Sequence, residues 1–188
     1  METGTVLVLV ILWLVVIWII WYVSLYNKIV KLKATRENAW SDIDVQLRLR
    51  FDLVDNLVET VKWYAKHEKD TLKEVIEARN KFATATDVKS KAEADNMLTV
   101  WLKSIFALSE AYPDLKANQN FLNLQNELSD IENKIAAARR YFNAATREYN
   151  TTVQEFPANV LFHKQPEDYF EGIEEAKKLQ KLNLINSI

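Results

Sequence analysis

The sequence predicts an all-α protein: a single-pass N-terminal transmembrane helix followed by an antiparallel bundle of three to four long helices. One observation is an uncharged apolar run near the N-terminus, and another is helical spacing of apolar residues through most of the remainder. Only two Gly and three Pro occur in 188 residues, which favours long helices with few tight turns. We expect an anchor at residues 1–26, a long-helix bundle at 27–160 and a tail with a short helix at 161–188.

The expected anchor is the run from Thr5 to Tyr26, which contains no charge, Pro or Gly. About 20 apolar residues cross a hydrocarbon core of about 30 Å, and a helix satisfies its own backbone groups in lipid. The acidic Glu2, the length of the run and the lack of a small-residue cleavage site argue against a secretory signal peptide. Within this run, the residues that we expect to anchor the helix in the lipid bilayer are Thr5, Trp13, Trp18, Trp21, Tyr22 and Tyr26.

The charges beside the span predict its orientation. Glu2 precedes the span, and a basic inner flank follows it, formed by Lys28, Lys31, Lys33 and Arg36. Basic flanks stay in the cytoplasm, so we expect a cytoplasmic bundle and a short N-terminus outside. The aromatic residues ending the span suit an interfacial belt. The two deeper tryptophans are explained equally well by lipid packing or by contact between helices of an oligomer.

The composition argues against most catalytic and nucleic-acid-binding classes. The net charge is −2, so no basic field for nucleic acid is expected. There is no Cys, which excludes disulfides, thiolate metal sites and a Cys nucleophile. His67-Glu68 begins like a zinc-protease helix, but Thr71 stands where the second His is required. Two Gly are too few for a phosphate-binding loop. We therefore expect no enzyme, metal or cofactor.

The bundle itself is predicted from apolar residues at alternating steps of three and four. A first helix extends to about Lys66, and the sequence leaves open whether the span continues into it. A second begins near Glu68, has a kink or loop between Ala83 and Ser90, and stops at Pro113, the expected break between helices. A third, of roughly 35 to 40 residues, ends before Pro157. Short connections favour antiparallel neighbours.

In the tail, Pro166 suits the first position of a further short helix. Acidic residues come early and lysines late, which matches the helix dipole. We expect this helix to pack on the bundle, with a membrane-bound or partner-bound helix as the alternative.

Charged residues inside the apolar stripes are the candidates for specific contacts. Arg50 and Arg79 occupy seam positions, where a buried Arg requires a partner. An ion pair within one subunit, to Glu127, Asp130 or Glu132 on the third helix, is one interpretation, and a contact between subunits or a docking site is the other. The remaining candidates for interhelical or inter-subunit contacts are Phe51 on a parallel apolar strip, Arg139, Arg140 and Asn143.

Several runs resemble the LemA family. They are YNKIV after the span, AWSDIDVQLRLRFDLVDNLVETVKWYAKHE, EAR at Glu77 to Arg79, and YPDLKANQNFLNLQNELSDIENKIAAARRYFNAATREYNTTVQEFP. Differences from the family pattern include Asp55 in place of Pro, Leu49 between paired basic residues, and Trp63 in place of Gly. The resemblance implies a bacterial inner-membrane protein with a LemA-like long-helix bundle in the cytoplasm. It supplies no catalytic residues.

From these features we expect a non-enzymatic, membrane-anchored helical scaffold. It would self-associate, as a homo-oligomer, and organise membrane or partner proteins at the cytoplasmic face. The alternative is an adaptor or accessory subunit for a membrane protease or signalling protein, with a membrane protein as its partner.

Overall fold

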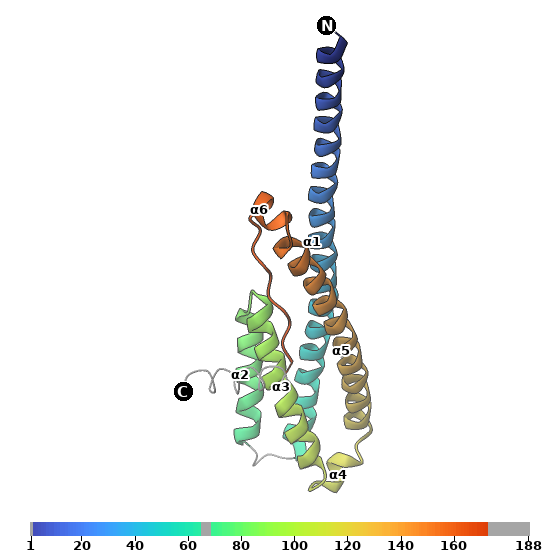
Figure 1. The fold of residues 1–188 in the computed structure, drawn as a ribbon. Coiled ribbons are helices and arrows are strands. Elements are labelled where there is room, and N and C mark those ends of the chain that lie inside the picture. The colour runs from blue at the N-terminus through green and yellow to red at the C-terminus, as the bar shows by residue number, and fades with distance from the viewer. Residues whose placement is uncertain (1, 65–68, 173–188) are drawn as a thin grey trace, which may run out of the picture. The chain divides into compact units, whose positions relative to one another are not determined.

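A computed structural model describes residues 2–64 and 69–172 of the chain (Figure 1). These residues contain helices and no strand, which confirms the prediction of an all-α fold. The helices are α1 (Glu2–Tyr64), α2 (Lys69–Thr84), α3 (Val88–Ser109), α4 (Pro113–Lys116), α5 (Gln119–Gln154) and α6 (Ala158–Phe162).

Helix α1 is continuous over 63 residues, from Glu2 to Tyr64. The apolar run therefore extends into the first bundle helix without a break. Neither Pro nor Gly occurs between Thr5 and Tyr64, so nothing in this stretch removes a backbone donor or adds the flexibility that ends helices.

The described residues form two compact units. Unit 1 contains residues 2–38 and 144–167, and unit 2 contains residues 39–64, 69–143 and 168–172. Each unit has its own hydrophobic core. Both α1 and α5 contribute residues to each unit, because their ranges include a boundary between the two.

The core of unit 1 is small and combines residues of α1, α5 and α6. Its buried members are Ile29, Tyr149, Val153 and Ala158. On α6, Phe162 lies against two aromatic residues of α1, with ring centroids 5.2 Å from Tyr22 and 5.7 Å from Tyr26. Two of the aromatic residues expected to form an interfacial belt therefore also pack within the protein.

The core of unit 2 is larger and consists of two clusters. One combines residues of α1 to α5, with Trp101 at 1% exposure among its largest side chains. The other is built around Ile43, Leu47 and Phe142 and also includes Phe170, which is fully buried. These side chains confirm the heptad seam predicted for the first bundle helix, because Ile43, Leu47, Val54 and Leu57 are almost completely buried.

The breaks between helices follow local sequence signals. The Asp87 side chain caps α3 by accepting a hydrogen bond from the Ser90 backbone N–H at 3.2 Å. This interruption between α2 and α3 lies within the predicted range of Ala83 to Ser90. Pro113 occupies the first turn of α4, where its missing N–H costs nothing. Helix α5 then extends over 36 residues, as its apolar spacing predicts.

The tail helix expected from Pro166 is not formed by residues 166–172, which are non-helical. The remainder of the predicted helix lies outside the described residues. Two backbone N–H groups donate to asparagine side chains instead. The N–H of Glu167 donates to Asn150 at 2.8 Å, and that of Phe170 donates to Asn143 at 2.9 Å. A backbone donor that is held by a side chain is not available to a helix, so the helix does not begin at Pro166 as expected.

Of the two contacts expected for Phe51, interhelical or inter-subunit, the structure shows the interhelical one. The Phe51 side chain is 6% exposed and stacks on Phe82 of α2, with ring centroids 4.0 Å apart. Phe51 is therefore part of the core of unit 2, and its interpretation as a contact between subunits is wrong.

Candidate functional site

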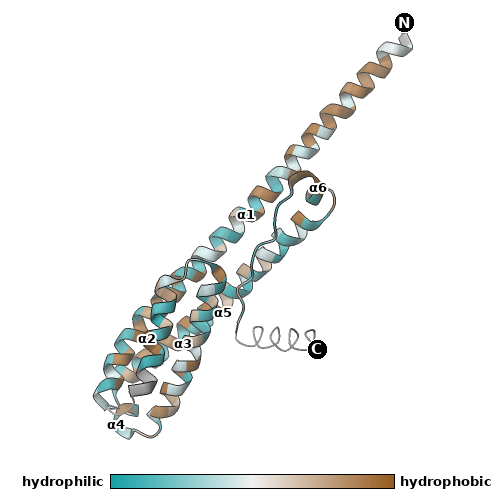
Figure 2. Ribbon diagram, turned by 90° about the vertical axis from the view of Figure 1, so that its left-hand side faces the viewer, coloured by the Kyte–Doolittle hydropathy of each residue, from teal (hydrophilic) through white to brown (hydrophobic). Residues whose placement is uncertain are grey.

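The apolar surface of α1 is the most extensive functional feature of unit 1. Its large apolar side chains from Val6 to Trp21 are 43–66% exposed, although residues of this kind are usually buried. The N-terminal part of the helix is correspondingly brown in Figure 2. By length and composition, this is the one helix among the described residues that could cross a membrane. The helix therefore has the length and the apolar surface that a membrane anchor requires.

The selected anchor residues differ in their surroundings. Thr5, Trp13, Trp18 and Trp21 are exposed, and Trp18 stacks on the partly buried Tyr22 at 5.6 Å between ring centroids. Tyr26 is 47% exposed despite its contact with Phe162.

The basic flank contains one residue with a different role. Lys28, Lys31 and Lys33 are exposed, whereas Arg36 is 7% exposed. The Arg36 guanidinium pairs with the Glu167 carboxylate at 3.3 Å and donates to Thr146 Oγ1 at 3.2 Å. Arg36 is therefore part of the interior of unit 1, whereas the sequence placed it in the basic flank with the three lysines.

An asparagine of α5 holds Glu167 through its backbone. Asn150 Oδ1 accepts from the Glu167 N–H at 2.8 Å, and Asn150 Nδ2 donates to the Glu167 carbonyl at 2.9 Å. Together with the Arg36 ion pair, these bonds fix both the backbone and the side chain of one residue. Asn150 itself is 6% exposed, so this amide clamp belongs to the interior of unit 1.

The strongest electrostatic feature of unit 2 is centred on Arg50. Its guanidinium lies 2.5 Å from Asp95 on α3 and 2.7 Å from Glu132 on α5. Arg50 and Asp95 are 2% and 6% exposed, whereas Glu132 is 48% exposed. One cation therefore joins three helices within a single subunit, with one carboxylate inside the core and one at its edge.

Burial raises the pKa of Asp95 above that of an ordinary aspartate. Desolvation is the largest cause, and the attraction of Arg50 offsets it only in part because the Glu132 carboxylate also disfavours a second negative charge. Such a pair gains little over apolar residues of the same shape, but removing one partner leaves a buried charge uncompensated. The cluster therefore fixes which helices meet here more than it adds net stability.

A second ion pair joins Lys91 of α3 to Asp44 of α1. The Lys91 ammonium also lies 5.6 Å from the centroid of the Trp40 ring and 5.4 Å from that of Phe82. Partial burial raises the pKa of Asp44, but the hydrogen bonds and charges of Lys91 and Arg48 outweigh it and lower the pKa overall. The ionised carboxylate is therefore the form that the folded protein favours.

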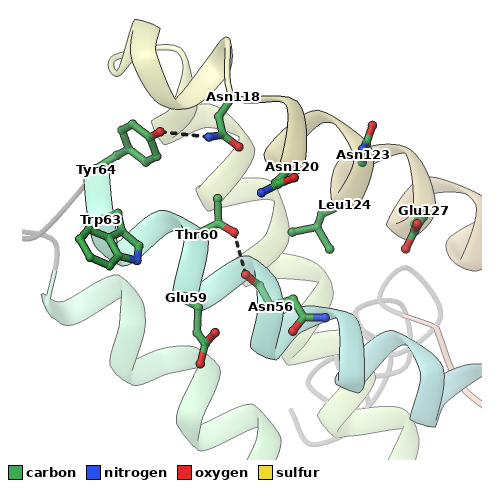
Figure 3. Close-up of a pocket in the computed structure, with 10 residues that line it drawn as sticks. All are labelled: Asn56, Glu59, Thr60, Trp63, Tyr64, Asn118, Asn120, Asn123, Leu124 and Glu127. Carbon is green, nitrogen blue, oxygen red and sulfur yellow. Dashed lines mark hydrogen bonds between the residues drawn. The ribbon is translucent and has the colours of Figure 1, made fainter.

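An open polar pocket of about 690 Å³ lies between the end of α1 and the start of α5 in unit 2 (Figure 3). The Trp63 indole is 77% exposed, and the Tyr64 hydroxyl accepts a hydrogen bond from Asn118 at 3.0 Å. The lining residues are Asn56, Glu59, Thr60, Trp63, Tyr64, Asn118, Asn120, Asn123, Leu124 and Glu127. With amides, two carboxylates and no basic residue, this lining suits neutral or cationic ligands rather than anions.

The other candidates for specific contacts are placed as follows. Arg79 is 60% exposed and pairs with Asp55 at 3.0 Å, so it lies at the surface and not in the seam where it was expected. The buried face of α2 consists of Val75 and Ala78 instead. Arg139 is half-buried and Arg140 is exposed.

Asn143, also half-buried, binds the backbone of Phe170 in unit 2. This contact lies within one subunit, as do those of Arg50, Phe51 and Glu132.

Sequence reasoning missed Asp95, because the partners considered for Arg50 were all on the third predicted helix. A signal was present: Asp95 precedes Leu98, Leu102 and Ile105 at steps of three, four and three, which places it on the buried stripe of α3. The asparagine clamps had no comparable signal, because their partners are backbone groups of a distant segment.

Together these features define an all-helical protein with one helix long and apolar enough to cross a membrane and a bundle held by buried ion pairs. The family model of the LemA family matches residues 39–183, which is most of the chain, and the protein belongs to this family. The family is membrane-associated, in agreement with the exposed apolar half of α1. No curated protein matches the sequence significantly.

Proposed function

We propose that this protein is a non-enzymatic scaffold, anchored in a bacterial inner membrane by α1, that self-associates and organises membrane or partner proteins at the cytoplasmic face. The observation that carries the proposal is the continuity of α1, which joins an exposed apolar surface to a buried bundle helix. The exposed Lys28, Lys31 and Lys33 support the cytoplasmic placement.

Self-association is supported by apolar residues that remain exposed on the bundle part of α1. Val45 and Leu49 are 51% and 46% exposed and lie four residues apart, so they share one face of the helix. A second copy could cover this face. The absence of a catalytic motif in the sequence supports a non-enzymatic role.

The test is the mass of the full-length protein in mild detergent, measured by native mass spectrometry. We expect a defined homo-oligomer for the wild type and a smaller species for Val45→Asp/Leu49→Asp, with unchanged helicity by circular dichroism. The matched control is Asp52→Asn, an exposed position of the same helix. A monomeric wild type would contradict the self-association part of the proposal.

The polar pocket favours the adaptor role as a second candidate. An exposed tryptophan beside amide and carboxylate groups is typical of a partner-binding surface. If this role holds, a membrane-protein partner should co-purify with the wild type and be lost from Trp63→Ala. It should be kept by Phe156→Ala, which removes another strongly exposed aromatic residue (83%). Equal recovery of the partner with both variants would exclude the pocket as its docking site.

A further inference from the structure

In unit 2, residues 168–172 are held by the bundle in the way that a receptor holds a short peptide. This part of the chain follows α6 and is drawn without a helix in Figure 1. It needs no helix of its own, because its polar backbone groups find partners on the bundle.

The main contact is a pair of hydrogen bonds to one asparagine. The Phe170 N–H donates to Asn143 Oδ1 at 2.9 Å, and Asn143 Nδ2 donates to the Phe170 carbonyl at 3.0 Å. The two backbone groups of one residue point the same way only when that residue is extended, as in a strand. Asn143 therefore recognises an extended backbone, whatever side chain it carries.

Helix α3 adds a third backbone contact and thereby fixes the direction of the segment. Asn96 Nδ2 donates to the Glu171 carbonyl at 3.2 Å. The carbonyl that accepts this hydrogen bond lies one residue beyond the clamp, so the segment cannot shift its register along the bundle without losing the bond.

One side chain anchors the segment. Phe170 is fully buried within the cluster that contains Phe142, and its ring centroid lies 6.2 Å from that of Trp40. By contrast, Tyr169 is 39% exposed and Asp168 is exposed as well. Backbone bonds with a single aromatic anchor are the pattern of peptide recognition rather than of a packed core element.

We propose that Trp40, Asn96, Phe142 and Asn143 form a peptide-binding socket. It takes an extended segment with an aromatic anchor, and residues 168–172 of a second copy can occupy it in place of the chain's own. The second copy is the occupant that the structure favours, because it carries the segment already seen to fit. Exchange of identical segments is a low-cost route to assembly. This inference rests on the self-association part of the proposed function.

Exchange requires a connection that can be redirected. The residues that lead into the segment, from His163 to Pro166, are exposed and non-helical. His163 adopts a left-handed backbone conformation, with φ of 46°, directly after α6. No core residue of unit 1 lies in this stretch of four, so redirecting it leaves that hydrophobic core intact. The contacts of Glu167 with Arg36 and Asn150 must break during the exchange, and Glu167 of the second copy can make them again.

The test uses the full-length Phe170→Ala variant in mild detergent, whose own segment lacks the anchor. The probe is a fluorescent peptide with the sequence of residues 164–172, KQPEDYFEG. We expect saturable binding by fluorescence anisotropy. The double variant Phe170→Ala/Asn143→Ala should bind about 30-fold more weakly, because two hydrogen bonds are lost. The matched control Phe170→Ala/Asn133→Ala changes an exposed asparagine of the same helix and should bind normally.

Hydrogen exchange of the wild-type chain provides a measurement that does not depend on the stability of any variant. Excess unlabelled peptide should increase exchange at residues 168–172 as the chain's own segment is displaced. A peptide carrying Ala in place of its Phe should not.

Absence of both binding and displacement would overturn the socket, even if the wild type is an oligomer. Equally tight binding by Phe170→Ala and by Phe170→Ala/Asn143→Ala would overturn the socket too. Asn143-dependent binding by a chain that native mass spectrometry shows to be monomeric would support the socket and contradict self-association.

Discussion

The two halves of α1 have the same secondary structure and opposite surfaces. From Val6 to Trp21 every large apolar side chain is at least 43% exposed, whereas Ile43, Leu47 and Leu57 in the second half are fully buried. The first half is apolar on all sides, and the second is apolar on one stripe with charges between. The difference shows that a helix packed in a bundle carries its apolar residues on one stripe, whereas a helix that could cross a membrane carries them on all sides.

The largest expected effect comes from placing charge in the first half. Leu12→Arg/Val16→Arg should transfer the protein from the membrane to the soluble fraction, because each Arg near the centre of a span costs about 2.5–3.5 kcal/mol. Fractionation followed by immunoblotting measures this. The matched control Val45→Arg/Leu49→Arg uses exposed positions of the second half and should stay in the membrane. If both variants were lost from the membrane, the first half of α1 would not differ from the second in its role as the anchor, which would contradict the comparison.

The next effect concerns the buried ion pair of the second half. Arg50→Leu should lower the free energy of unfolding by about 3–5 kcal/mol, because Asp95 then remains buried without its partner. Arg50→Leu/Asp95→Leu should recover much of the loss. Urea denaturation measures both. The exposed partner of Arg50 should matter less: Glu132→Gln should lower the free energy of unfolding by about 1 kcal/mol or less. Equal losses for Asp95→Leu and Glu132→Gln would contradict the role of burial.

A smaller effect, with a defined pH dependence, is expected at Asp44. Its pKa is lowered below the ordinary value of 3.8, so the ionised carboxylate stabilises the fold above that value. This contribution is lost as the pH falls through the lowered pKa of the folded state. Asp44→Asn should therefore be about 1 kcal/mol less stable than the wild type at pH 7. The two should converge in acid, and a constant difference in denaturant titrations across this range would contradict the ion pair.

The smallest effect is expected at Arg79. Its ion pair with Asp55 has side chains that are 60% and 46% exposed, and such pairs contribute at most about 1 kcal/mol. Arg79→Ala should change the thermal midpoint little, and high salt should remove what difference exists. A loss as large as that of Arg50→Leu would show that Arg79 occupies the seam after all.

The helices could be predicted from the sequence because their signals are local. The apolar span, the heptad spacing and Pro113 each specify a helix or its end within a few residues. The stripe of α5 from Phe121 to Tyr149 is buried as its spacing predicts, except that Leu124 and Ala138 are only partly buried. The continuity of α1 could be read only as the absence of a break.

The polar contacts could not be predicted fully, because they depend on which helix faces which. Arg50 and Glu132 were identified by position, but Asp95 became a partner only through the packing of α3. Arg36 was predicted to belong to the basic flank of the span, but it forms an ion pair with Glu167 inside unit 1. The tail had a helical charge pattern, yet Asn143 and Asn150 hold its backbone in another conformation. Competition between a local preference and a distant side chain is not visible in the segment itself.

The most direct test of the account is the water accessibility of single cysteines along α1 in intact membranes. The chain has no native Cys, so each introduced thiol reports one position. Leu12→Cys and Val16→Cys should resist a water-soluble maleimide. Glu37→Cys and Lys62→Cys, at exposed positions of the second half that lie off the Val45/Leu49 face, should react once the cytoplasmic face is opened. Labelling of Leu12→Cys as fast as that of Lys62→Cys would contradict the claim that one helix joins a membrane span to a bundle.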